Sequence, residues 1–157
     1  SSLSRLSKPR LLLALAAQHQ EAGNATEALE LLEKARTRAE IGKVEDSIGV
    51  AKAYRKFGKP EIARSILQSV PDRIQTEARS LDDPTQLKIL NLLNLGHQLA
   101  LLGQSQQALS HLSQAEKLLQ TVSNPIYITD DPSESAAQIL ALGYAAANAC
   151  PTRTDDR

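Results

Sequence analysis

The segment Leu93–Ala115, which reads LNLGHQLALLGQSQQALSHLSQA, decides the fold. Apolar residues on both sides of Gly103 recur with the spacing of an α-helix. In the second half, Ala108, Leu112 and Ala115 lie at i, i+4 and i+7 and share one helical face. Glycine is typical of a helix end, because it adopts the left-handed conformation at little steric cost. The segment therefore predicts two helices joined by a short turn.

The same register occurs twice earlier in the chain. Leu13–Ala35 reads LALAAQHQEAGNATEALELLEKA, and Ile48–Val70 reads IGVAKAYRKFGKPEIARSILQSV. Small residues at facing positions allow two helices to approach closely, and leucines fill the grooves between them. Repetition at this period is typical of solenoids, in which each helix pair buries its apolar face against the next. The repeated positions are Ala16, Ala51 and Gly96; Gly23, Gly58 and Gly103; Ala28, Ala63 and Ala108; Leu32, Leu67 and Leu112; and Ala35, Val70 and Ala115.

Helix-start signals agree with these pairs. Asn24 with Glu27 predicts a capping box, and the Asp-Asp-Pro sequences at 82–84 and 130–132 predict two further helix starts. The predicted helices cover residues 7–22, 25–40, 44–57, 60–69, 72–81, 84–102, 105–121 and 132–149. We expect one domain over residues 1–157, with repeats at 7–40, 44–81 (extended) and 84–121, a fourth or capping helix at 132–149, and a disordered tail at 150–157.

The recurring L-G, G, A, L and A positions resemble the tetratricopeptide repeat (TPR). The match is best from Leu95-Gly96 to Ala115, and Leu142-Gly143 resembles the start of a fourth unit. The interval from Gly58 to Gly103 is longer than that from Gly23 to Gly58, so the second unit departs from the pattern. The resemblance implies an all-α fold, a right-handed α-solenoid of antiparallel helix pairs (a TPR-like superhelix). Related helical-repeat families share this pattern.

The resemblance also implies a function, because the first helices of such repeats line a concave groove that binds a protein or peptide. The groove would have a basic centre beside an apolar, partly aromatic wall, which suits a partner with acidic and apolar anchors. The alternative is that the basic residues form only a solvated helix face. The positions expected to contact the partner are Gln20, Lys52, Arg55, Lys56, Asn94, His97, Leu101 and Tyr144, and Leu93 and Ala100 are also expected to face the groove.

Composition argues against several other functions. Lys plus Arg and Asp plus Glu number 18 each, whereas a nucleic-acid-binding protein usually has a basic excess. No apolar run approaches the roughly 20 residues needed to span a membrane. Cys150 is the only cysteine, which excludes a disulfide within the chain and a cysteine-based zinc site. The chain begins at Ser1 and contains no Met, which we interpret as a processed or excised piece. The compartment is not indicated, and a soluble cytoplasmic protein is the default expectation.

No catalytic, cofactor-binding or metal-binding residues are predicted. The sequence contains no phosphate-binding loop and no nucleophile elbow, and its histidines lack the spacing of a helical zinc site. His19 falls at an expected core position. We therefore predict a non-enzymatic scaffold, with two alternatives. One is homo-oligomeric self-assembly, because the fourth unit leaves Ile139, Leu142 and Ala146 without a covering helix. The other is a hydrolase that uses His97 or Cys150.

Overall fold

The computed structural model describes residues 8–122 and 136–149, and all the regular secondary structure in these ranges is helical. The all-α prediction is confirmed. None of the helices described is both long and apolar enough to cross a membrane. The helices are α2 (Pro9–Glu21), α3 (Ala25–Glu40), α4 (Val44–Lys56), α5 (Pro60–Gln68), α6 (Val70–Ala78), α7 (Thr85–Leu101), α8 (Ser105–Leu119) and α9 (Ala136–Ala149).

The predicted helices agree closely with those observed. The largest shift is in α6, which runs over Val70–Ala78 instead of the expected 72–81. Part of the last predicted helix, 132–135, lies outside the described residues, as do the Asp130-Asp131-Pro132 start and the expected tail at 150–157. Contacts divide the chain into two compact units, Ser1–Val70 and Pro71–Arg157.

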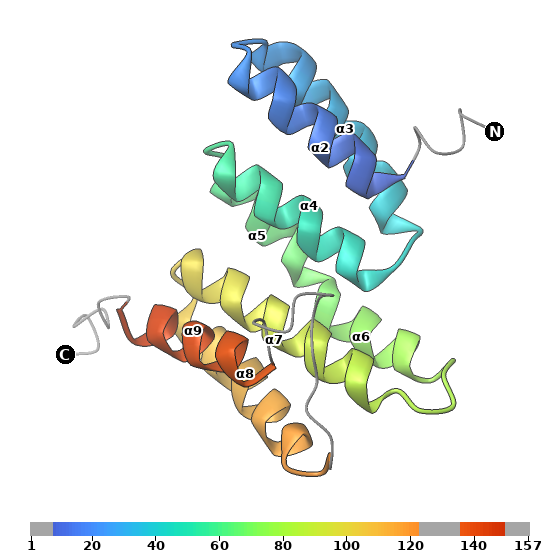
Figure 1. The fold of residues 1–157 in the computed structure, drawn as a ribbon, viewed down its shortest axis with the longest axis vertical. Helices are drawn as coiled ribbons and strands as arrows, with labels where there is room; N and C mark the ends of the chain where they lie inside the picture. Colours follow the sequence, from blue (N-terminus) through green and yellow to red (C-terminus); the bar gives the residue numbers. More distant parts are fainter. Residues whose placement is uncertain (1–7, 123–135, 150–157) are drawn as a thin grey trace. The chain divides into compact units, whose positions relative to one another are not determined.

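The first unit consists of two helix pairs. Helix α2 packs against α3, and α4 packs against α5 (Figure 1). Helix α4 also contacts both α2 and α3, so the first helix of the second pair packs against the first pair. Proline occupies the start of α2 and of α5, where its missing N–H removes no helical hydrogen bond.

The second unit also contains a helix pair that a third helix contacts. Helices α7 and α8 form a pair, and α9 contacts both of them (Figure 1). The two arrangements differ in detail, because α4 packs more extensively on α3 than on α2, whereas α9 packs more extensively on α7 than on α8.

The repeated register forms the cores. Ala28, Leu32 and Ala35 of α3 are fully buried, and their counterparts in the other two repeats are buried as well. Burying one leucine side chain contributes about 1.5–3 kcal/mol, so these positions are a large part of the stabilising free energy. The predicted inward-facing positions are therefore confirmed. The counterparts are Ala63, Leu67 and Val70 in the second repeat, and Ala108, Leu112 and Ala115 in the third.

The turn inside each pair ends the first helix with the same hydrogen-bond motif. Gly23, Gly58 and Gly103 have φ of 83°, 75° and 81°, the left-handed conformation that the sequence predicts. In the first turn the Gly23 N–H donates to Gln20 O at 3.1 Å, and the Asn24 N–H donates to His19 O at 2.8 Å. These two bonds satisfy carbonyl groups that a helix end leaves without a partner, which makes the turn a Schellman motif.

Two predicted helix caps have different outcomes. The capping box at Asn24 is wrong, because the Asn24 side chain makes no capping hydrogen bond. At the Asp82-Asp83-Pro84 start, Pro84 is the N-cap residue of α7 and no side chain caps the helix, but Asp83 Oδ1 accepts a hydrogen bond from the Thr85 N–H at 3.2 Å just before it. The helix consequently begins at Thr85, one residue after the proline.

Candidate partner-binding site

The two first helices of the first unit meet at a small residue. The Cδ1 atom of Leu13 on α2 lies 3.6 Å from the position of a Cβ atom on Gly49 of α4. Ala14 and Ala17 of α2 are exposed. We call the surface formed by α2 and α4 around the contact of Leu13 with Gly49 the α2–α4 face.

Exposed cationic side chains lie on α4. Lys52 and Lys56 are one helical turn apart on the same side of the helix, and both are exposed. Neither forms an ion pair with any residue that the structure describes. Lys56 lies in the last turn of α4, where a cation interacts favourably with the negative end of the helix dipole. Arg55 is half-buried and engaged in other interactions, and Gln20 is exposed on α2.

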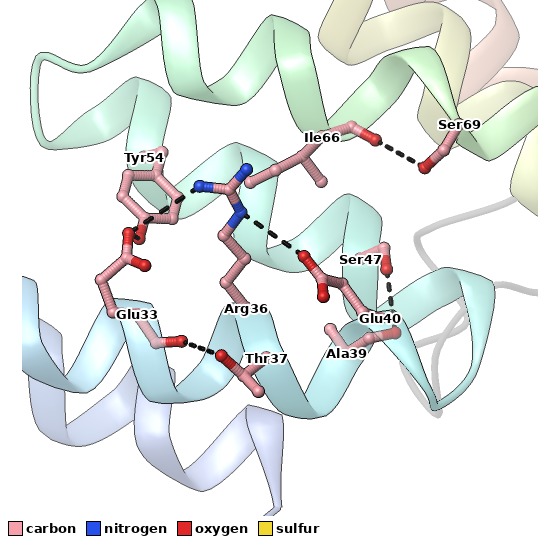
Figure 2. A network of polar contacts seen from close by, with 9 residues as sticks. All are labelled: Glu33, Arg36, Thr37, Ala39, Glu40, Ser47, Tyr54, Ile66 and Ser69. Atoms are coloured by element: carbon pink, nitrogen blue, oxygen red, sulfur yellow. Dashed lines mark hydrogen bonds and ion pairs between the residues drawn. The ribbon is translucent and has the colours of Figure 1, made fainter.

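Helix α4 is held against α3 by a polar network (Figure 2). The Tyr54 hydroxyl donates a hydrogen bond to the carboxylate of Glu33, which also faces Arg36 at 3.9 Å. Burial, followed by the bond to Glu33, raises the pKa of Tyr54 well above its ordinary value of 10.0. Near the start of α4, Ser47 Oγ donates to the Ala39 carbonyl oxygen at 3.1 Å. These contacts set which side of α4 faces α3 and leave Lys52 and Lys56 exposed.

The remaining predicted groove residues lie in the second unit. Asn94 and His97 on α7 are half-buried, and Leu101 is exposed at the end of that helix. Tyr144 on α9 is half-buried, and its hydroxyl donates to Glu116 Oε2 on α8 at 2.6 Å. This hydrogen bond, followed by desolvation, raises the pKa of Tyr144 to about 12. The tyrosine therefore holds α9 against α8.

Two expectations for the apolar wall are wrong. Leu93 and Ala100 are fully buried, so neither is available to contact a partner. Leu93 lies in a part of α7 that is buried on more than one side. The resemblance to the tetratricopeptide repeat, which places this residue in a groove, does not predict that burial. The eight predicted site residues are divided between the two units, four in each. A groove that continues through both units stays a prediction.

The histidines lie apart from any metal-like cluster. Within residues 8–122 and 136–149, no group of three or more His, Cys, Asp and Glu residues is placed to hold a metal ion. His19, which was expected in the core, is only half-buried. His111 on α8 has a buried Nδ1 atom without a hydrogen-bond partner, and burial lowers the pKa of this histidine below its ordinary 6.5. Cys150 lies outside the described residues.

A shallow hollow lies along α3, where the sequence predicted no site. Its volume is about 480 Å³, and its lining comes from that one helix. It lies on a second helix of a pair and is therefore not part of the α2–α4 face. It is lined by charged side chains, a threonine and one half-buried leucine, which is not an arrangement typical of a catalytic or metal site. The lining residues are Thr26, Leu29, Glu30, Glu33 and Lys34.

Sequence reasoning missed the two tyrosine–glutamate bonds. Their partners are separated by 21 residues for Tyr54 and Glu33 and by 28 residues for Tyr144 and Glu116. Neither pair has a short-range pattern that would indicate it. The two bonds are also not at matching register positions, since Tyr54 lies three residues after Ala51 and Tyr144 directly follows Gly143.

Comparison with known proteins adds no relative. No protein-family model matches the chain, and neither the search of curated proteins nor that of solved structures finds a match.

Proposed function

We propose that this chain is a TPR-like helical-repeat module whose α2–α4 face binds an acidic segment of a partner protein. The observation that carries the proposal is the placement of Lys52 and Lys56. They are exposed on one side of α4, a turn apart, with no ion pair to the described residues. The solenoid arrangement and the groove belong to the same proposal, supported by the recurring sequence register and by the contact of a third helix with both members of a pair in each unit.

The chemistry of the face indicates the class of ligand. Two ammonium groups without internal partners can accept carboxylates with little rearrangement of the chain, and complementary charges favour both specificity and fast association. Each exposed ion pair contributes about 0.2–1 kcal/mol, so charge alone gives weak binding. Leu13, which is half-buried against Gly49, offers an apolar contact on the same face. We therefore expect a ligand with two or more acidic residues near an apolar residue.

Selection from a random peptide library tests this proposal. Peptides enriched by the chain should be rich in Asp and Glu, and their affinity should fall as salt rises, since exposed charge pairs are screened. The double variant Lys52→Glu with Lys56→Glu should bind the selected peptides at least about tenfold more weakly, a loss of about 1.4 kcal/mol. The matched control, Lys43→Glu with Lys117→Glu, makes the same change of charge at two other exposed lysines, one at the N-cap position before α4 and one on α8.

Two results would remove the basic face from the proposal. The first is enrichment of peptides without an acidic excess. The second is equal loss of affinity in the test and control variants, which would show that only net charge matters. Circular dichroism on all variants establishes that the helices are retained.

The hydrolase alternative receives no support from a described contact. It requires His97, which is half-buried on α7, or Cys150, which lies outside the described residues. The self-assembly alternative is based on the apolar residues of α9, of which Leu142 is exposed.

A further inference from the structure

The charged residues on one side of α4 are ordered by sign along the helix. Glu45, Gly49, Lys52 and Lys56 are spaced at i, i+4, i+7 and i+11, so all four lie on the same side of α4. Glu45 is in the first turn, Lys56 is in the last turn, and the three charged side chains are exposed. This side of α4, which we call the α4 strip, therefore has a carboxylate at one end and two ammonium groups at the other.

Gly49 shows that the α4 strip borders α2. Helices α2 and α4 contact each other within the first unit (Figure 1), and a Cβ atom on Gly49 would lie 3.6 Å from Leu13 Cδ1. Because Glu45 and Lys52 lie one turn before and one turn after Gly49 on the same side of the helix, they flank this contact. The α2–α4 face thus presents, in order, a carboxylate, the apolar Leu13 and two ammonium groups.

The exposed carboxylate of Glu45 can pair with a cation of a ligand. It forms no ion pair with any residue within 8–122 and 136–149. A negative charge in the first turn of α4 also interacts favourably with the positive end of the helix dipole. That interaction requires no direct bond to the carboxylate, so it does not prevent a ligand from binding there.

We propose that the α2–α4 face selects a partner segment in which the charges are ordered, with two acidic residues at one end, an apolar residue next and a basic residue at the other end. The acidic residues pair with Lys56 and Lys52, the apolar residue contacts Leu13, and the basic residue pairs with Glu45. A segment that is acidic throughout would place a carboxylate against Glu45, and facing like charges disfavour binding. This inference rests on the function proposed above and adds to it the basic residue and the order of the charges.

The length of the α4 strip predicts the spacing of the ligand residues. From Glu45 to Lys56, eleven steps of 1.5 Å along the helix, the strip is about 16.5 Å long. A short peptide does not form a stable helix in water, so we consider an extended ligand. In an extended segment every second side chain lies on the same side, and six residues span about 20 Å, a difference that the long Lys and Glu side chains can bridge. We therefore expect the pattern acidic, acidic, apolar, basic at alternate positions, in either chain direction.

Reversing the charge at position 45 tests this order. The ordered peptide has nine residues, with glutamate at its second and fourth positions, leucine at its sixth, lysine at its eighth and serine elsewhere. The acidic peptide is identical except that glutamate replaces the lysine, and each peptide is also made with its sequence reversed. The peptides are titrated at low salt to millimolar concentrations and followed by NMR, because exposed charge pairs are weak and are screened by salt. In the chain direction that binds more tightly, the unaltered chain should prefer the ordered peptide about three- to tenfold, and Glu45→Lys should prefer the acidic peptide by a similar factor.

The matched control is Glu27→Lys, which makes the same change of charge at an exposed residue in the first turn of α3, a helix that is not part of the α2–α4 face. It should keep the preference for the ordered peptide. The inference is overturned if Glu45→Lys keeps that preference, or if Glu27→Lys reverses it equally. The function proposed above would be retained in both cases, provided that Lys52→Glu with Lys56→Glu weakens the binding of both peptides. If neither peptide binds to the unaltered chain, both proposals are wrong.

Discussion

Leu112 occupies the space beside Gly143, where an added Cβ atom would lie 2.8 Å from Leu112 Cδ2. A Cβ on Gly96 would lie 2.7 Å from Leu112 Cγ. One leucine of α8 therefore packs closely against glycines of both α7 and α9. This arrangement explains why the register requires the smallest residues at these two positions.

Replacing Gly96 by alanine should destabilise the second unit. Alanine favours a helix over glycine by about 1 kcal/mol, but overpacking a core costs about 1–3 kcal/mol. We expect a net loss of about 1 kcal/mol in the free energy of unfolding, measured by urea denaturation. Gly49→Ala is the control, because its Cβ would lie at an ordinary 3.6 Å from Leu13 and should stabilise by up to about 1 kcal/mol. Stabilisation by Gly96→Ala would contradict the crowding around Leu112.

Removing the hydroxyl of Ser47 should loosen the connection between α3 and α4. Its Oγ is buried and donates to the Ala39 carbonyl, so Ser47→Ala leaves that carbonyl with one partner fewer. We expect a loss of about 1 kcal/mol in unfolding free energy. Thr37 makes a matched bond of the same 3.1 Å length to Glu33 O, but on an exposed surface. Thr37→Ala should change stability by less than about 0.5 kcal/mol, and equal effects of the two substitutions would argue against a role for burial.

The bond from Tyr144 to Glu116 should stabilise α9 below pH 10 and lose its effect in alkali. The pKa of Tyr144 is raised from 10.0 to about 12, so the folded state keeps the phenol proton after the unfolded state has lost it. This contribution is complete below pH 10 and disappears as pH rises to about 12. Tyr144→Phe should therefore cost about 1 kcal/mol at pH 8 and much less near pH 12, measured by urea denaturation. A difference that is constant with pH would contradict the hydrogen bond.

Replacing His111 by leucine should stabilise the second unit and reduce its sensitivity to acid. Leu31 and Ile66 occupy the same register position in the other repeats, and the buried Nδ1 of His111 has no partner. Burial lowers the pKa of His111 below 6.5, so the unfolded state binds a proton more readily. Stability should be complete above about pH 6.5 and decrease as pH falls below that value.

We expect His111→Leu to raise the unfolding free energy by about 1 kcal/mol at pH 7, with a larger gain at pH 5. Thermal or urea unfolding of both proteins at the two pH values measures this. The interpretation would be wrong if the substituted protein kept the acid dependence of the original.

The sequence by itself determined the helices, their turns and the inward-facing positions of the repeated register. These features depend on residues within one or two helical turns. Glycine at positions 23, 58 and 103 ends a helix for a local steric reason, and the Ala-Leu-Ala spacing defines one side of a helix without knowledge of its neighbour. Even here one local prediction failed. The Asn24 backbone N–H completes the Schellman motif, and its side chain makes no cap.

Only the tertiary structure decided which sides remain exposed. Leu93 and Ala100 are buried, although the repeat pattern places them in a groove. Tyr54 and Tyr144 form hydrogen bonds with glutamates that are 21 and 28 residues away in the sequence. The physical reason is that a helix has several sides, and its own sequence specifies an apolar side without specifying which other helices cover it. Contacts between residues far apart in the chain make that choice, and in α9 they leave Leu142 facing outward.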